Sequence, residues 1–505
     1  MNLIMALEMS AQSHPQRIAV RCGSAELSYE QLLSAARAAA VRIRASGVQY
    51  VALLDVNSPT APIALFAAAC AGVPYVPMNY RLTGCELEEL LGRITPALLI
   101  STDEAFASLT LPAGIAVVRR DEFLREALEG GSEVETPAAE GSDAAVQLFT
   151  SGTTGKPKSA VLRHQNLMSY LLGTVEFGAA AESEASLISV PPYHIAGISA
   201  VLSSTYAGRR MVQLPAFDAA GWLHACREEQ VTNAFLVPTM LARIVDHLAQ
   251  TGETPNTPSL RAIAYGGGKM PLPVIQQAVK LFPEVSFTNA YGLTETSSTI
   301  CLLGPEDHSN ALHDRDPAVR RRLGSVGRPV PGVEIQIRGE SGEVLASGQS
   351  GEVFVRGDQV AGEYLEKGSV LDAEGWFATR DRGQLDELGY LFLEGRSDDV
   401  IVRGGENISP GEIEDVLLTH PAVADVAVVA VPDRQWGEAV GAVVVLRESA
   451  KAEAPELQSW VRERLRSSRV PAVVRFDTQL PYNETGKVLR RVLKQQFAAG
   501  ETSAD

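Results

Sequence analysis

Apolar residues in the first half of the chain fall into short runs that alternate with alanine-rich stretches. Val51–Val56 and Leu98–Ser101 have the length and apolar character of buried strands, and Ala61–Ala71 between them has the composition of a helix. Strands that alternate with helices are typical of a layered α/β fold with a mostly parallel sheet. We therefore predict this fold for about the first 250 residues.

The pattern changes at two points further along the chain. From Gly324 to Gly395, glycines and prolines separate short strands such as Glu334–Arg338 and Gly351–Arg356, which indicates an antiparallel β region. Beyond Arg396–Asp399, the chain is long enough to enclose a separate small core. The elements expected there are a helix over Pro410–Thr419, strands over Val423–Val431 and Gly441–Leu446, a helix over Leu457–Arg466, a loop over Pro481–Gly486 and a basic helix ending near Gln496.

The predicted architecture is therefore α/β with two domains of unequal size. Residues 1–397 are expected to form a large layered α/β N-terminal domain with a β subdomain, and residues 398–505 a small α+β C-terminal lid domain. A chain of 505 residues exceeds what one hydrophobic core normally organises, which agrees with this division.

One uncharged segment, Pro59–Tyr80, is long enough to raise the question of a membrane span. It contains four prolines and many alanines, so a buried helix that ends near Gly72, followed by a short strand, accounts better for it. The segment Met1–Ser10 lacks the basic region and the apolar stretch of a signal peptide. We expect no integral membrane association.

Composition and charge exclude several classes of protein. Apolar residues make up 45% of the chain and charged residues 21%, which is typical of a well-packed globular protein. The net charge of −17 argues against binding to nucleic acid, so any polyphosphate ligand requires a local arrangement of donors. The five cysteines form no Cys-x-x-Cys pair, which predicts neither a disulfide framework nor a zinc site and favours a cytoplasmic location.

A loop rich in hydroxyls, glycines and lysines is the strongest chemical signal in the chain. It lies between the apolar runs Val146–Phe149 and Ala160–Leu162, and its sequence is Thr150-Ser151-Gly152-Thr153-Thr154-Gly155-Lys156-Pro157-Lys158. Glycines allow backbone N–H groups to approach an anion, hydroxyls donate hydrogen bonds, and lysines add charge. The segment lacks the spacing of a Walker A loop. It predicts a phosphate-binding loop, and the alternative is a flexible polar hairpin.

Two further clusters carry groups that suit a nucleotide. Their sequences are Ala264-Tyr265-Gly266-Gly267-Gly268 and Asn289-Ala290-Tyr291-Gly292-Leu293-Thr294-Glu295-Thr296. In the second cluster, Tyr291 offers a face on which a purine can stack, Thr294 offers a hydroxyl for phosphate, and Glu295 offers a carboxylate for Mg²⁺. Taken alone, the first cluster is a sharp glycine turn and the second is a strand end before a helix.

These motifs, together with Asp381, Gly395–Glu414 and Asn483–Lys487, resemble those of the adenylate-forming superfamily. That superfamily contains acyl-CoA synthetases, adenylation domains of nonribosomal peptide synthetases, and luciferases. The motifs follow the family's order and extend from about residue 20 to residue 495. The resemblance to the acyl-CoA synthetase branch implies an enzyme that forms an acyl-AMP from a carboxylic acid and ATP with Mg²⁺. The acyl group is then transferred to coenzyme A.

The resemblance implies roles for several single residues. Asp381 matches the carboxylate that holds both ribose hydroxyls of AMP, and Arg396 matches a second contact to the ribose. Lys487 matches the lysine that bridges the attacking carboxylate and the α-phosphate, where charge grows in the transition state. His194 matches a position beside the acyl and phosphate groups. Viewed alone, each is an ordinary buried or surface side chain.

The resemblance also implies a mobile lid. Asp398 matches the hinge between the two domains, and the loop Gly404-Gly405-Glu406 matches the loop that closes over the thiol-transfer site. After adenylation, the lid is expected to rotate about Asp398, withdraw Lys487 and bring this loop toward the site.

The acyl pocket is expected to be roomy and uncharged. By resemblance, its walls come from Tyr193–Ser199, Val237–Met240, Tyr265–Gly268 and the segment around Ser297–Leu302. The pocket residues are Tyr193, Ala196, Gly197, Val237, Thr239 and Ser297. His194, if protonated, is the only charged group in these segments. This predicts a bulky apolar acid, such as an aromatic, alicyclic, polycyclic or medium-to-long fatty acid, because a dicarboxylate such as malonate requires a cationic anchor.

Other functions remain open at this point. An adenylation enzyme can load its acid onto a carrier protein; no carrier-like segment follows the lid, and an assay with both acceptors separates the two cases. A non-catalytic module that senses an acyl-adenylate or acyl-CoA is disfavoured by the presence of Lys487 and Asp381. Neither the identity of the acid nor the oligomeric state follows from the sequence.

Two positions depart from the family pattern. Ser159 stands where a glycine usually follows Pro-Lys, and Arg380 stands where the ribose motif usually reads Thr-Gly-Asp. A side chain at either position is restrictive if the backbone needs a positive φ. One interpretation is that Ser159 has extended angles and Arg380 points to solvent. The other is a thiolation-only enzyme, which accepts an acyl-adenylate made elsewhere, for example by a partner adenylating ligase.

Overall fold

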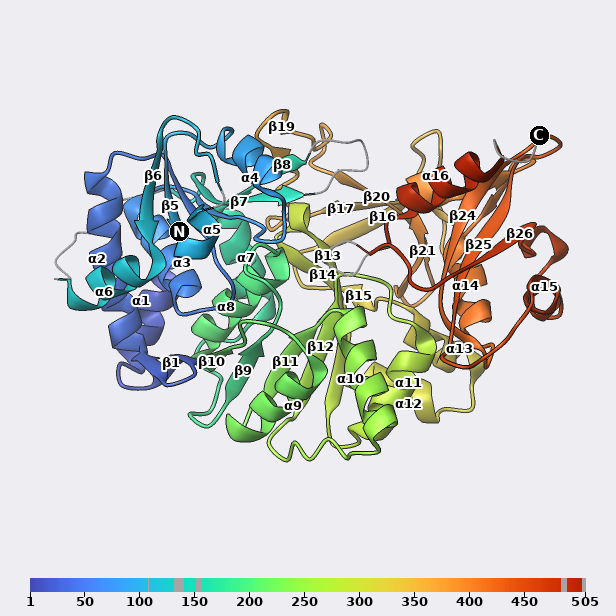
Figure 1. Ribbon diagram of the computed structural model, residues 1–505, viewed down its shortest axis with the longest axis horizontal. Helices are drawn as coiled ribbons and strands as arrows, with labels where there is room; N and C mark the ends of the chain where they lie inside the picture. The colour runs from blue at the N-terminus through green and yellow to red at the C-terminus, as the bar shows by residue number, and fades with distance from the viewer. Residues whose placement is uncertain (108, 131–139, 151–156, 483–487, 502–505) are drawn as a thin grey trace.

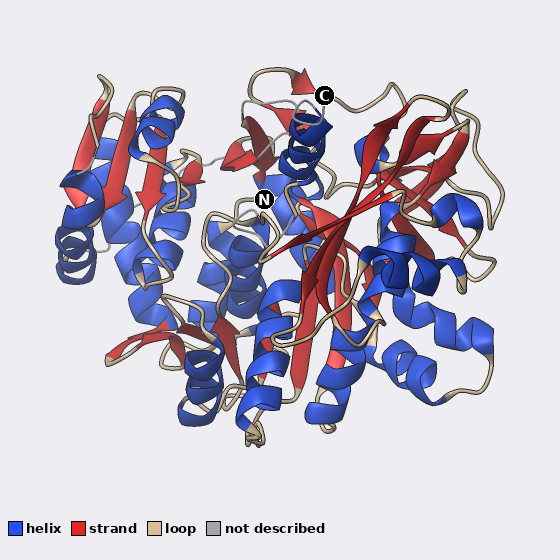
Figure 2. Ribbon diagram, turned by 45° about the vertical axis from the view of Figure 1, so that its right-hand side comes forward, coloured by secondary structure: helices blue, strands red, loops and turns tan. Residues whose placement is uncertain are grey.

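The structure of the protein is a computed structural model, which describes residues 1–107, 109–130, 140–150, 157–482 and 488–501. Over these residues the chain forms four β-sheets, with helices packed against them (Figures 1 and 2). Three sheets belong to a large N-terminal domain and the fourth to a small C-terminal domain, so the predicted fold class is confirmed.

Two large sheets with parallel centres form the main body of the large domain. Their strand orders are β15-β14-β13-β12-β11-β9-β10-β1-β2 and β19-β18-β8-β7-β4-β3-β5-β6. Pairing is parallel from β13 to β1 in the first sheet and from β7 to β6 in the second, and antiparallel strands continue beyond these ranges. The parallel centres explain why strands and helices alternate along the sequence.

The bounds of these elements are as follows. The first sheet contains β1 (Ile18–Cys22), β2 (Ala25–Ser28), β9 (Ala185–Ile188), β10 (Arg210–Gln213), β11 (Asn233–Leu236), β12 (Ala262–Gly266), β13 (Ser286–Leu293), β14 (Ser298–Leu303) and β15 (Arg328–Pro329). The second contains β3 (Tyr50–Leu54), β4 (Tyr75–Pro77), β5 (Ala97–Ser101), β6 (Ile115–Arg119), β7 (Ala144–Thr150), β8 (Lys158–Arg163), β18 (Glu363–Tyr364) and β19 (Gly368–Ser369). The helices that cover them are α1 (Ile4–Ser13), α2 (Tyr29–Ala45), α3 (Thr60–Ala71), α4 (Gly84–Leu91), α5 (Asp103–Ala107), α6 (Arg120–Glu129), α7 (His164–Thr174), α8 (Ile195–Ala207), α9 (Ala219–Glu228), α10 (Pro238–Thr251), α11 (Leu272–Leu281), α12 (Pro305–His313) and α13 (Pro317–Arg321).

Helix α3 is the centre of the largest apolar core. Its residues are buried on every side from Thr60 to Cys70, which explains why the sequence shows no polar face. Gly72 ends the helix with a φ of +78°, and β4 follows, as predicted for this segment. None of the helices in the described part of the chain combines the length and the apolar character that a membrane span requires.

A third sheet of four antiparallel strands lies between the large sheets and the small domain (Figure 1). It contains β16 (Glu334–Arg338), β17 (Gly351–Arg356), β20 (Phe377–Leu385) and β21 (Leu391–Arg396). The first two strands have the predicted bounds. Buried and less buried residues alternate along β17 and the first part of β20, as expected when one face of a sheet packs on a core.

The small domain is built on one sheet with helices on both faces. The sheet contains β22 (Ile401–Arg403), β23 (Glu406–Ile408), β24 (Val423–Asp433), β25 (Gly437–Leu446) and β26 (Val473–Asp477). Val426 and Val428 of β24 pack with α14 (Pro410–Leu418) and α15 (Ala454–Arg462), whereas Val429 and Val431 pack with α16 (Arg490–Glu501). Because successive side chains point to opposite faces, a strand covered on both sides is a continuous apolar run.

Two predicted helix ends in the small domain are wrong. The helix expected to end at Arg466 ends at Arg462, and the last helix continues past Gln496 to Glu501. No glycine or proline marks the first of these ends in the sequence, so the pattern of apolar residues was the only guide there, whereas Gly500 lies one residue before the second end.

Asn57 fastens the two large sheets together. It follows β3 of the second sheet, and its buried Nδ2 donates to the carbonyls of Ile188 at 3.2 Å, Val190 at 3.2 Å and Leu214 at 3.1 Å. These carbonyls lie at the ends of β9 and β10 in the first sheet. If the Asn57 amide is removed, these buried carbonyls lose their hydrogen-bond donor.

We expect Asn57→Ala to lower the free energy of unfolding by about 2 kcal/mol, because buried carbonyls lose their hydrogen bonds. Urea denaturation followed by fluorescence measures the shift in midpoint. Asn310→Ala, at an exposed position of α12, is the matched control and is expected to change the midpoint little. Equal midpoints for the two variants would show that Asn57 does not fasten the sheets.

Candidate active site

Asp381 lies at the centre of a polar cluster on the third sheet. Its Oδ2 accepts a hydrogen bond of 2.6 Å from the Tyr291 hydroxyl, and its Oδ1 accepts one of 3.2 Å from Arg396 Nη1. The register of the sheet explains the second contact, because Asp381 in β20 lies opposite Arg396 in β21. Asp381 is only 8% exposed, and the two donors offset much of the cost of burying its charge.

Tyr291 reaches this cluster from β13 of the first sheet, 90 residues earlier in the chain. Burial and the neighbouring Asp381 charge raise the pKa of Tyr291 well above its usual value. The hydroxyl therefore stays protonated and continues to donate to Asp381 at neutral pH. The sequence indicated Tyr291 as a stacking face; the structure adds that its hydroxyl positions a carboxylate.

The backbone on either side of Asp381 is unusual. Thr379 Oγ1 donates to the Val353 carbonyl at 2.8 Å and accepts from the Asp381 N–H at 3.1 Å. Arg380 has a φ of +62°, in the left-handed region that glycine adopts readily and that costs other residues about 1 kcal/mol. Its side chain is exposed. The position therefore has a backbone conformation that glycine adopts readily, although an arginine occupies it.

Ser159, the other residue that differs from the family pattern, has an extended backbone instead of a left-handed one. It lies within β8, opposite Phe149 of β7, and it is fully buried. Its carbonyl accepts from the Leu365 N–H at 2.9 Å. Because extended strand angles suit any residue, the hypothesis that a side chain at Ser159 restricts the loop is wrong.

A second carboxylate, Glu295, lies beside the phosphate loop. Its Oε1 accepts a hydrogen bond of 2.6 Å from the Tyr364 hydroxyl, and its carbonyl accepts from the N–H groups of Ala361 at 2.9 Å and Gly362 at 3.0 Å. Burial and the Glu295 charge raise the pKa of Tyr364. Lys158 Nζ lies 5.3 Å from the centre of the Tyr364 ring. Sequence reasoning missed Tyr364, because a lone tyrosine in a strand of two residues carries no signal.

Glu295 fits a magnesium ion that is shared with phosphates. Mg²⁺ in such sites binds one or two carboxylates, substrate phosphate oxygens and several waters. Over the residues that the structure describes, no group of three His, Cys, Asp or Glu side chains converges, so a cage made of protein alone is not found there. Thr294 precedes Glu295 in the short 3-10 helix η1 (Thr294–Thr296) and lies in the same turn.

The phosphate-loop motif forms the connection of a β-hairpin. Thr150 ends β7 and Lys158 begins β8, where the two residues are paired and the Thr150 hydroxyl lies 3.4 Å from the Lys158 carbonyl. The remaining predicted donors lie outside the described residues; they are Ser151, Gly152, Thr153, Thr154, Gly155 and Lys156.

The glycine turn after β12 is tightly packed against β13. A Cβ at Gly266 would lie 2.1 Å from the Ala290 carbonyl oxygen, so only glycine allows the two parallel strands to pair here. Gly267 has a φ of +82°, and the position of its missing Cβ is 3.6 Å from a methyl of Val237. Gly268 continues the turn next to Pro238 of α10.

The segments predicted to line the acyl pocket meet in pairs. Gly267 packs on Val237, which joins the glycine turn to the start of α10. The hydrogen bond of 3.1 Å from Ser298 Oγ to Ser199 Oγ joins the segment around Ser297 to α8. Ser297 is fully buried with a φ of +54°, and Thr239 is half-buried in the first turn of α10.

Near these segments, two other predicted residues are glycines at close backbone contacts, and a third forms a hydrogen bond between segments. A Cβ at Gly292 would lie 1.8 Å from the Ser298 carbonyl oxygen. A Cβ at Gly197 would lie 2.5 Å from the Pro191 carbonyl oxygen. Asn289 Nδ2 donates to the Ser325 carbonyl at 3.2 Å. These contacts keep the strands and α8 close together where the pocket is expected.

Tyr193 and His194 lie at the start of α8. The Tyr193 ring meets Tyr80 edge-on with centroids 5.2 Å apart, and it lies 4.4 Å from the His194 ring. His194 is the N-cap residue and Ala196 is in the first turn, and both are half-buried. The side chains gathered here are aromatic, apolar or hydroxyl-bearing, apart from His194.

In the small domain, Gly404 and Gly405 form the two-residue turn between β22 and β23. Their φ values are +59° and +86°, which the tight hairpin requires of both residues. The Gly404 N–H donates to the Trp436 carbonyl at 2.9 Å, and Glu406 is paired with Arg469. The predicted loop is thus a hairpin of the small domain.

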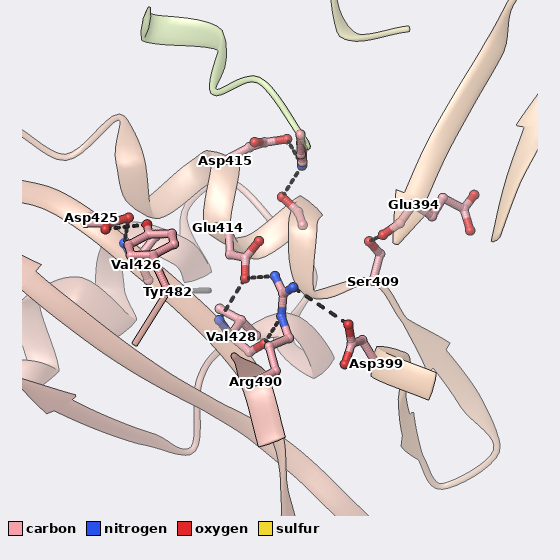
Figure 3. Close-up of polar contacts among 12 residues, drawn as sticks. Glu394, Asp399, Ser409, Glu414, Asp415, Asp425, Val426, Val428, Tyr482 and Arg490 are labelled. Carbon is pink, nitrogen blue, oxygen red and sulfur yellow. Dashed lines mark hydrogen bonds and ion pairs between the residues drawn. The ribbon is translucent and has the colours of Figure 1, made fainter. Parts of the chain in front are cut away.

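The predicted hinge, Asp398, lies in η3 (Ser397–Asp399), and its carbonyl accepts from Lys494 Nζ at 3.3 Å. Arg490 forms a network of polar contacts that includes Asp399, the residue after the predicted hinge (Figure 3). Its guanidinium donates to Glu414 Oε1 at 2.5 Å and to the Val428 carbonyl at 3.2 Å, and lies 3.7 Å from Asp399 Oδ2. Sequence reasoning missed Arg490, which it placed in a basic helix without a role.

Lys487 lies outside the described residues, but the chain on either side of it is anchored. Tyr482 pairs with Val488, and the Leu489 N–H donates to the Pro481 carbonyl at 2.7 Å. The Tyr482 hydroxyl donates to Asp425 Oδ2 at 2.6 Å (Figure 3). The role of Lys487 stays a prediction.

Comparison of the sequence with known proteins gives a family match over most of the chain. The profile of the AMP-binding enzyme family matches residues 7–365, and that of the AMP-binding enzyme C-terminal domain matches residues 412–487. The feruloyl-CoA synthase of an Amycolatopsis species is 32% identical over 96% of this chain and 97% of its own.

Solved structures give similar matches. The o-succinylbenzoate CoA synthetase MenE of Bacillus subtilis, in complex with the acyl-adenylate OSB-AMP, is 30% identical with a TM-score of 0.83 over 97% of both chains. MatB of Rhodopseudomonas palustris is 26% identical over 98% of this chain and 99% of its own. Its TM-score is 0.86 in the ATP-bound form and 0.77 in the apo form.

We expect Tyr291→Phe to weaken ATP binding about tenfold, because the buried Asp381 carboxylate loses a charge-assisted hydrogen bond. Isothermal titration calorimetry with ATP measures the change. Tyr390→Phe is the matched control, since it removes a bond of the same length, 2.6 Å, from a tyrosine to Asp307. If both variants bind ATP as the wild type does, Tyr291 does not prepare Asp381 for the nucleotide.

Proposed function

This chain belongs to the AMP-binding enzyme family, and from that membership and the site described above we propose that it is an AMP-forming acid–CoA ligase. It joins a bulky apolar carboxylic acid to coenzyme A through an acyl-AMP intermediate, and it uses ATP and Mg²⁺. Two of the relatives support this proposal, since both are named as CoA synthases or synthetases and one was solved with an acyl-adenylate.

The observation that carries the proposal is the pair of carboxylate clusters around Asp381 and Glu295. Asp381, fixed by Tyr291, presents two acceptor oxygens for a ribose diol. Glu295 and Lys158 meet at Tyr364, next to the phosphate-loop hairpin. Tyr291, near the end of β13, holds Asp381, and Glu295 lies in η1 directly after that strand, so the two clusters are neighbours. Ribose and phosphate groups of one nucleotide therefore suit the same site.

In the first half-reaction, a carboxylate oxygen of the acid attacks the α-phosphorus of ATP. The bond to the β-phosphate breaks, and pyrophosphate leaves. Asp381 holds the ribose, and Lys158 with the loop of residues 150–158 holds the phosphates, which keeps the α-phosphorus in place for attack. Glu295 would hold Mg²⁺ together with the phosphates, and the ion would supply positive charge for the leaving pyrophosphate. We assign the cation at the reacting oxygens to Lys487.

In the second half-reaction, the CoA thiol sulfur attacks the acyl carbonyl carbon. The bond to the phosphate oxygen breaks, AMP leaves, and a thioester remains. We place the domain boundary at Ser397 and Asp398 and propose that the small domain, residues 398–505, rotates there between the two steps. The rotation brings the Gly404–Gly405 turn toward the site, because the two steps need different groups at one carbonyl.

The acid is proposed to be bulky and apolar. The residues gathered at the start of α8 and α10 are Tyr193, Ala196, Gly197, Val237 and Thr239, none of which anchors a second carboxylate. The names of two relatives, feruloyl-CoA synthase and o-succinylbenzoate CoA synthetase, also indicate aromatic acids.

All five cysteines are free thiols, which favours a cytoplasmic location.

A panel of acids tests this proposal. We expect CoA-dependent thioester formation, detected by mass spectrometry, to be fastest with aromatic, polycyclic or medium-to-long fatty acids, because they fill an apolar pocket. Acetate and malonate are the controls, and much faster turnover of either contradicts the proposed pocket. Replacing CoA with a phosphopantetheinylated carrier protein in the same assay decides between the two acceptors.

A second candidate function, a thiolation-only ligase, has one observation in its favour. The left-handed backbone at Arg380 places a long cationic side chain beside Asp381, where the family pattern has none. If that side chain obstructs ATP, only an acyl-adenylate made by a partner ligase enters the second step. The exposure of Arg380 and the extended backbone of Ser159 favour the complete two-step enzyme.

We expect the wild-type enzyme to release pyrophosphate readily with its preferred acid. Arg380→Gly is expected to raise the free energy of unfolding by about 1 kcal/mol, because glycine adopts the left-handed backbone without strain. Pyrophosphate release and thioester formation from synthetic acyl-AMP are compared in both proteins. Rapid thiolation without any adenylation in the wild type, with adenylation gained in Arg380→Gly, supports the thiolation-only function instead.

A further inference from the structure

Lys269 joins the large domain to the small domain. It lies directly after the glycine turn of residues 266–268, and its Nζ donates to the Gly411 carbonyl at 2.9 Å and to Asp415 Oδ2 at 2.7 Å. Gly411 and Asp415 both belong to α14 of the small domain, 142 and 146 residues further along the chain. Figure 3 shows Asp415 on the side of α14 that faces away from Arg490.

The residues around this contact fit a lysine at this place. A Cβ at Gly411 would lie 2.7 Å from Lys269 Nζ, so a larger residue would displace the ammonium group. Three acidic residues, Glu412, Glu414 and Asp415, follow within α14. Glu412 and Glu414 each pair with an arginine of the small domain, so Lys269 supplies the cation for Asp415.

The strength of the contact suits a bond that must open during each catalytic cycle. The Lys269 and Asp415 side chains are 49% and 45% exposed. Ion pairs with this exposure contribute about 0.2–1 kcal/mol, so the pair changes the balance between two lid positions without locking either. A fully buried pair would cost far more to break.

The structure superimposes differently on two forms of MatB. Identity and coverage are the same for the ATP-bound and apo forms, yet the TM-scores are 0.86 and 0.77. Over its whole length, this chain is therefore more similar to the ATP-bound form than to the apo form.

We propose that Lys269 is a positioning residue for the first half-reaction, which holds α14, and with it the small domain, in the orientation required for adenylation. The proposal rests on the proposed two-step function. It also connects the lid to the site, since Lys269 lies two residues after Gly267, which packs on Val237 at the pocket. A bound acid or nucleotide that fixes the conformation of this turn therefore also fixes the position of Lys269 and its contact with α14.

The expected consequence is a split between the two half-reactions. Lys269→Met and Asp415→Asn remove the pair and are expected to lower the rate of acid-dependent ATP–pyrophosphate exchange about two- to fivefold, since the adenylation orientation becomes less populated. Thioester formation from synthetic acyl-AMP and CoA is expected to be unchanged or faster. The exchanged pair Lys269→Asp/Asp415→Lys is expected to recover part of the lost adenylation rate.

The matched control is Arg125→Met, which removes an exposed ion pair with Glu129 within one helix of the large domain. It is expected to change neither rate. Equal losses in both half-reactions, or an unchanged exchange rate in Lys269→Met and Asp415→Asn, would overturn the proposal. No recovery in the exchanged pair would overturn it too, provided that the circular dichroism spectrum shows a folded protein.

A second measurement does not depend on the acid. Spin labels at Glu228→Cys in the large domain and Glu463→Cys in the small domain, in a Cys85→Ser background, report the distance between the domains. With ATP and Mg²⁺, a single main distance is expected in the otherwise wild-type protein and a broader distribution in Lys269→Met. Identical distributions contradict the lid contact, even if no acid supports turnover. An inactive wild type with the expected distances contradicts the proposed function alone.

Discussion

The hydrogen bond from Tyr291 to Asp381 is the contact on which the site depends. It joins the end of β13 in the first sheet to β20 in the third, and so it fixes how the β subdomain lies against the main body. A buried carboxylate without partners costs several kcal/mol, so Asp381 stays in place only while Tyr291 and Arg396 reach it. Glu295 lies in η1 directly after β13, which places the expected ribose and phosphate sites at neighbouring positions.

A chain with a net charge of −17 must hold a polyphosphate without a positive field. Three arginines of the large domain that lie at or near the site are paired with carboxylates: Arg93 with Glu366, Arg163 with Glu363, and Arg396 with Asp381. Such pairs hold each side chain in one orientation but add little net charge. Recognition of the nucleotide therefore depends on directed donors and acceptors, together with the charge of a bound Mg²⁺.

The small domain contains a charged network of its own and has polar contacts to the large domain. Arg490 is held by Glu414, Asp399 and a carbonyl of β24, which joins the segment after the proposed hinge to the last helix. Across the domains, the Ser409 hydroxyl donates to the Glu394 carbonyl of β21. Lys269 and Asp415 also form a half-exposed pair across the domains. A unit with polar contacts to its neighbour is what a rotation between two half-reactions requires.

The sequence by itself determined the features that depend on neighbouring residues. Alternating apolar runs set the α/β layers, and the glycine turn and the hydroxyl-rich loop are short motifs with a local chemical meaning. The tertiary structure alone decided which distant side chains meet: Tyr291 with Asp381, Glu295 with Tyr364, and Lys269 with Asp415 are 90, 69 and 146 residues apart. No local pattern encodes such pairs, since they arise when separate sheets and domains pack. The same reason separates Ser159 from Arg380, both of which replace a glycine of the family pattern. Regular strand pairing extends the backbone at Ser159, whereas Arg380 lies where the register between β20 and β17 shifts, and its backbone is left-handed.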